Sequence, residues 1–114
     1  MTALLLLSGI ATFAQQERWV GTWTCAPQTV DKRFMPYNNQ LDDRAVRQIV
    51  KVSIGGNTIR LKLSNELSDE PVEMESVYIA RAENEYDIDK ETVRYLKFHG
   101  KDGVILPAGK AVYS

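Results

Sequence analysis

The first side chains to consider for chemistry are one histidine and a few serines. Nucleophilic hydrolysis needs a hydroxyl or thiol within hydrogen-bond reach of a base that a carboxylate orients. His99 is the only histidine, and it lies beside a glycine in an expected turn. None of the serines that fall on expected strands or in a polar connection has the strained strand-to-helix elbow of a nucleophile; they are Ser53, Ser64, Ser68 and Ser76. We therefore predict no catalytic residue in this chain.

Carboxylates offer the next chemistry. Asp87, Asp89 and Glu91 alternate and could present oxygens to Ca²⁺, but their segment lacks the glycine and the distant bidentate glutamate of an EF-hand. One cysteine and one histidine do not make a zinc ligand set. Glu73 and Glu75 share a strand face as a glycosidase pair would, yet nothing in the sequence desolvates either carboxyl group. We predict no metal site and no cofactor.

Aromatic side chains give the remaining functional lead. Trp19 and Trp23 are four residues apart in an expected strand, which places them on one face about 13 Å apart. Such a pair can stack on sugar rings, and it can equally pack inward as part of a core. Tyr37, in an expected loop, is the third candidate. The sequence therefore predicts a candidate carbohydrate site at these three residues, with core packing as the alternative for the tryptophans.

The strongest structural signal lies between Arg44 and Ser64. Apolar residues recur at alternate positions on both sides of a Gly55-Gly56-Asn57 turn, with Gln48 as the polar exception. They are Val46, Val50, Val52 and Ile54 before the turn and Ile59, Leu61 and Leu63 after it. This alternation predicts a β-hairpin with one apolar face, and that face needs a second layer because an isolated hairpin is only marginally stable.

Further short strands are expected on both sides of this hairpin. They cover residues 18–26, 71–81, 93–98, 104–106 and 110–114, while residues 28–43 are expected to form a long loop and residues 83–91 an acidic turn. No segment has a convincing helical period. The pattern predicts an all-β domain, specifically an antiparallel, jelly-roll-like β-sandwich that is incomplete at its C-terminal end.

The beginning of the chain predicts export. Residues 1–14 are uncharged, contain an apolar run and end in small residues, which is typical of a secretory signal and leaves a domain at residues 15–114. A buried apolar strand is the alternative. The run is too short to span a bilayer. A secreted or periplasmic location follows, and Cys25, the only cysteine, is expected to be a buried small apolar residue.

Charge gives no indication of a polyanionic partner. The 14 basic and 15 acidic residues leave a net charge of −1. A nucleic-acid-binding or anionic-membrane surface normally shows a basic excess. We therefore expect neither partner.

The order of several short motifs resembles the N-terminal β-sandwich region of secreted GDSL-type (SGNH) esterases. The motifs are Trp19-Val20-Gly21-Thr22-Trp23, Ala26-Pro27-Gln28, Val46-Arg47-Gln48, Leu61-Lys62-Leu63-Ser64-Asn65, Pro71-Val72, Phe98-His99-Gly100 and Pro107-Ala108-Gly109. The resemblance runs from Trp19 to the end of the chain. It rests on the order and spacing of the motifs rather than on any one of them.

The resemblance implies that the chemistry lies elsewhere. In that family a downstream α/β/α domain carries the nucleophilic serine of Gly-Asp-Ser and an Asp-x-x-His pair. This chain has no Gly-Asp-Ser, and Leu96 stands three residues before His99. The resemblance thus implies an inactive accessory domain that packs in cis on a serine esterase, for example one acting on acetylated polysaccharide. A carbohydrate-binding module or a structural adhesion module is the alternative.

Overall fold

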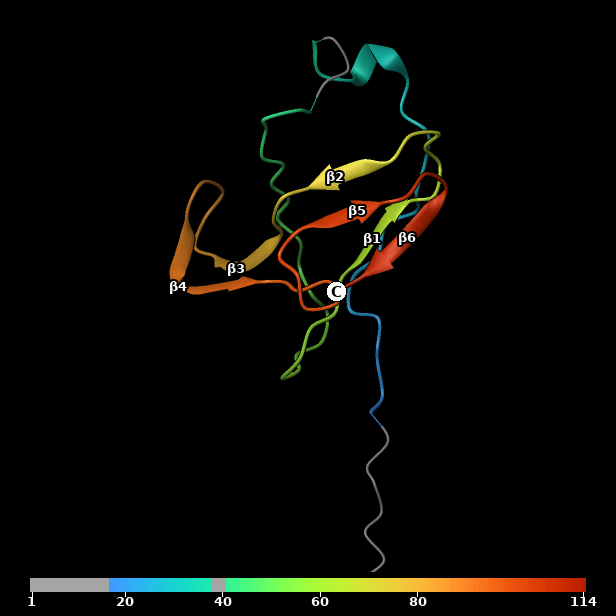
Figure 1. Ribbon diagram of the computed structural model, residues 1–114. Helices are drawn as coiled ribbons and strands as arrows, with labels where there is room; N and C mark the ends of the chain where they lie inside the picture. The colour runs from blue at the N-terminus through green and yellow to red at the C-terminus, as the bar shows by residue number, and fades with distance from the viewer. Residues whose placement is uncertain (1–16, 38–40) are drawn as a thin grey trace, which may run out of the picture.

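The structure is a computed structural model that describes residues 17–37 and 41–114 (Figure 1). The predicted signal at residues 1–14 lies outside the described residues. Within the described ranges the secondary structure consists of one short 3-10 turn and antiparallel strands, without an α-helix. The elements are η1 (Lys32–Phe34), β1 (Lys62–Asn65), β2 (Val72–Met74), β3 (Tyr78–Ala82), β4 (Ile88–Tyr95), β5 (Val104–Leu106) and β6 (Lys110–Tyr113). The prediction of an all-β, antiparallel fold is confirmed.

The strands form three two-stranded sheets, β1–β6, β2–β5 and β3–β4. Figure 1 shows β2, β5, β1 and β6 grouped in the body of the molecule, while the β3–β4 hairpin stands out to one side. No ladder of hydrogen bonds joins one sheet to another within the described ranges. The two-layered sandwich therefore stays a prediction.

Among the residues that the structure describes, no helix is long and apolar enough to cross a membrane.

The predicted hairpin between Arg44 and Ser64 is wrong in its pairing. The chain does turn back between residues 44 and 61 (Figure 1), but these residues form no strand. β1 pairs instead with β6, in the register Leu63 opposite Val112. Competition from other segments explains the difference: Thr22 exchanges hydrogen bonds with the backbone of Ser53 and Ile54, at 3.0 to 3.1 Å. The predicted alternation survives only in β1, where Leu63 is half-buried and its neighbours Lys62 and Ser64 are exposed.

Three other predicted elements also differ from the structure. Residues 18–26 form no strand, and Cys25 in that segment is exposed rather than buried. The single strand expected at residues 71–81 is two strands, β2 and β3, which pair with different partners. β4 begins at Ile88, inside the expected acidic turn, because its first residues pair with Arg81 and Ala82 of β3 across a register shift.

The buried core is small. Among the described residues only Leu96, Phe98 and Leu106 are buried. The backbone amide of Leu96 donates a hydrogen bond to the Val77 carbonyl at 2.8 Å. Tyr78 and Tyr95 pack across β3 and β4 with ring centroids 5.6 Å apart, the kind of aromatic cross-strand pair that stabilises a two-stranded ribbon.

Candidate functional site

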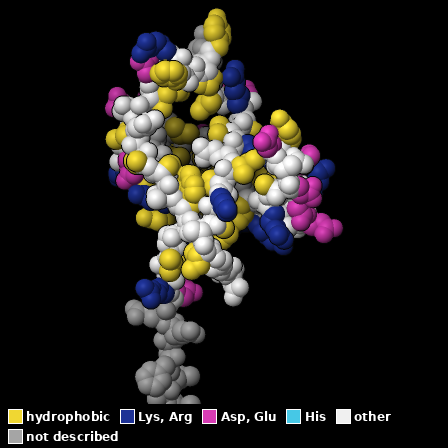
Figure 2. Space-filling model, turned by 180° about the vertical axis from the view of Figure 1, so that it is seen from behind, with side chains coloured by type: hydrophobic (Ala, Val, Ile, Leu, Met, Phe, Trp, Pro, Cys, Tyr) yellow, Lys and Arg dark blue, Asp and Glu magenta, His cyan; other side chains and the backbone are white. Residues whose placement is uncertain are grey.

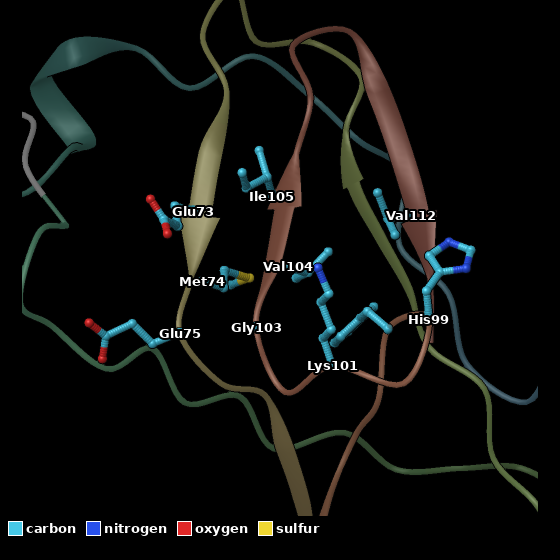
Figure 3. A pocket seen from close by; sticks show the side chains of 10 residues that line it. Glu73, Met74, Glu75, His99, Lys101, Gly103, Val104, Ile105 and Val112 are labelled. Carbon is cyan, nitrogen blue, oxygen red and sulfur yellow. The ribbon is translucent and has the colours of Figure 1, made fainter.

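A hollow lies between the β2–β5 sheet, β6 and the turn that precedes β5 (Figure 3). Its volume is about 680 Å³. Met74 and Val104 face the hollow, and the Lys101 side chain extends across it. Glu73 and Glu75 border it, but their side chains point away from β5. The hollow is thus mainly apolar, with one cation over it and two carboxylates at its outer edge.

The turn beside the hollow has a specific geometry. Phe98 and Lys101 exchange backbone hydrogen bonds of 2.8 and 3.0 Å, which leaves His99 and Gly100 as a two-residue loop. Both loop residues have positive φ, 51° and 81°. Positive φ at both positions defines the type I′ turn that connects twisted antiparallel strands. His99 therefore sits in this turn at a conformational cost that asparagine or glycine would not incur.

His99 is exposed, as expected for a turn residue. No hydrogen bond joins its ring to a serine, a cysteine or a carboxylate of the described residues, so the geometry needed for a nucleophile and its base does not form around it. The aspartates Asp87 and Asp89 serve local turns: Asp87 accepts from the Asn84 amide at 3.0 Å and Asp89 from the Glu91 backbone at 3.1 Å. Within the described ranges no group of three potential ligands among His, Cys, Asp and Glu is assembled.

The structure leaves the two candidate tryptophans exposed. Trp19 and Trp23 are 44% and 47% accessible, so neither is part of a core. The Arg60 guanidinium lies 3.9 Å from the centroid of the Trp19 ring, a cation–π contact that covers one face of the indole. Because residues 18–26 are not a strand, the argument that both rings share a strand face loses its basis. Only one face of Trp19 is open to a sugar.

Tyr37, the third candidate, is 85% accessible. It follows η1 (Lys32–Phe34) by three residues, and η1 lies at the end of the molecule opposite to the segment that begins at residue 17 (Figure 1). The structure therefore does not bring Tyr37 together with the start of the tryptophan segment. The three residues stay separate candidates.

One polar side chain that the chemical considerations did not single out links several segments. The Asn65 Nδ2 lies within hydrogen-bond distance of the carbonyls of Glu70, Leu106 and Pro107, at 2.8, 3.1 and 3.3 Å. The Asn65 carbonyl accepts from the Gly109 amide at 3.0 Å. Asn65 thus ties the end of β1 to the turn between β5 and β6. The acceptors of its side chain lie up to 42 residues away, so the only sequence signal for it is its place in the Leu61 to Asn65 motif.

Charged side chains at the surface make local pairs. The pKa of Glu66 lies below its usual range because its carboxylate accepts from the Ser64 hydroxyl at 2.9 Å and lies near the Lys62 ammonium. Lys97 and Asp102 form an ion pair across the two arms of the turn beside the hollow. Lys101 makes no ion pair with the described residues, in contrast to Lys97. Among the described residues, the hollow is thus lined by three charged side chains without an ion pair, the Lys101 ammonium and the carboxylates of Glu73 and Glu75.

No family model matches the chain, and no curated protein matches it.

Proposed function

We propose that this chain is the N-terminal accessory β-domain of a secreted GDSL/SGNH serine esterase, an acyl-ester hydrolase acting for example on acetylated polysaccharide. The domain is catalytically inert, and its role is to pack in cis on the catalytic domain and to extend its substrate groove. The order of motifs from Trp19 to the end of the chain is the basis for the choice of family. The sandwich arrangement typical of that region belongs to the same proposal.

The observation that carries the accessory role is the imbalance between buried and exposed apolar side chains. Three side chains are buried in the described ranges, whereas large apolar side chains at many positions are more than two-fifths exposed. Hydrophobic side chains are spread over the face seen in Figure 2 and line a hollow in its upper half. Soluble monomers rarely expose extended apolar patches, which usually mark an interface with another protein layer. A domain built to be covered by a second domain accounts for this surface.

The experiment is to sequence the gene beyond the codon for Ser114 and to express the longer product. The proposal predicts a Gly-Asp-Ser motif after a hydrophobic strand, and hydrolysis of a chromogenic acetate ester that is lost when that serine becomes alanine. A reading frame that closes without such a motif would refute the proposal.

A carbohydrate-binding module is the second candidate, favoured by the exposure of Trp19, Trp23 and Tyr37. Titration with acetylated xylan or pectin fragments would then quench tryptophan fluorescence. Replacing Trp23, which lacks the Arg60 contact of Trp19, should remove more of the quenching than replacing Trp19. Tryptophan fluorescence that does not change on addition of these polysaccharides would contradict a carbohydrate-binding role.

A further inference from the structure

We draw no further inference here: the strongest candidate, the mainly apolar hollow between the β2–β5 sheet, β6 and the turn before β5, carries none, because the unpaired charges of Lys101, Glu73 and Glu75 around it are of both signs and nothing in the described part of the chain shows what covers it.

Discussion

Replacing Gly103 by alanine should destabilise the pairing of β2 with β5. A Cβ atom at Gly103 would lie 3.1 Å from the Met74 carbonyl oxygen and 3.2 Å from that of Glu75. Both are closer than an ordinary van der Waals contact, and both neighbours are backbone atoms that cannot rotate away. The end of β2 must therefore move, which disturbs the pairing of Met74 with Val104.

The expected cost is about 1–3 kcal/mol in the free energy of unfolding, the range for an overpacked site. Gly55 provides the matched control, because a Cβ there meets nothing within 4 Å. Gly55→Ala should be neutral or stabilise by up to about 1 kcal/mol through the lower entropy of the unfolded chain. Urea denaturation followed by far-ultraviolet circular dichroism measures both variants. A Gly103→Ala protein as stable as the parent, with an unchanged dependence on urea, would refute the close approach of β5 to β2.

Three further substitutions test other parts of the structure. Asn65→Ala should lower the free energy of unfolding by about 1–3 kcal/mol, because carbonyls at the turn after β5 lose their donor; an unchanged urea midpoint would contradict the linking role. His99→Asn should leave the free energy of unfolding unchanged or raise it by a few tenths of a kcal/mol, while His99→Val should lower it, because asparagine tolerates positive φ and valine does not. Thermal unfolding compares the stabilities of the two variants. A valine variant more stable than the asparagine variant would exclude a type I′ turn. The folded-state pKa of Glu66 is lowered, so its contribution to stability is present above the unfolded pKa and is lost as the pH falls through the folded one. The parent should consequently lose more stability than Glu66→Gln between about pH 5 and pH 3, and parallel pH profiles would contradict the contact with Ser64 and Lys62.

Local turn chemistry was readable from the sequence. Gly103 and the Pro107-Ala108-Gly109 turn correctly bound a short strand at residues 104–106. The turn before it was also expected, because a glycine follows His99. These turns depend on residues that are neighbours in the sequence, and the backbone preferences of those residues are enough to predict them.

Strand pairing was not readable, because it depends on distant segments. The apolar alternation around Gly55 and Gly56 fits a hairpin of sequence neighbours, the commoner arrangement. In the structure β1 instead pairs with β6, nearly fifty residues away. Alternation specifies which face of a strand is buried and leaves the partner strand undetermined.

The candidate site was only partly predictable for the same reason. The sequence identified Trp19 as a candidate, but the stacking of Arg60 on its ring joins residues that only the fold brings together. The contacts of Asn65 likewise cross to the turn after β5. The expected burial of Cys25 was wrong: it was inferred from the lack of a second cysteine, whereas the segment around Cys25 forms no strand and leaves the thiol exposed.

The most direct test of the accessory role is the rate at which the purified 114-residue chain hydrolyses a chromogenic acetate ester. We predict no turnover above the buffer rate, alongside turnover by the longer gene product. Hydrolysis by the 114-residue chain that His99→Ala abolishes would contradict the account, because it would place the reactive groups in this domain.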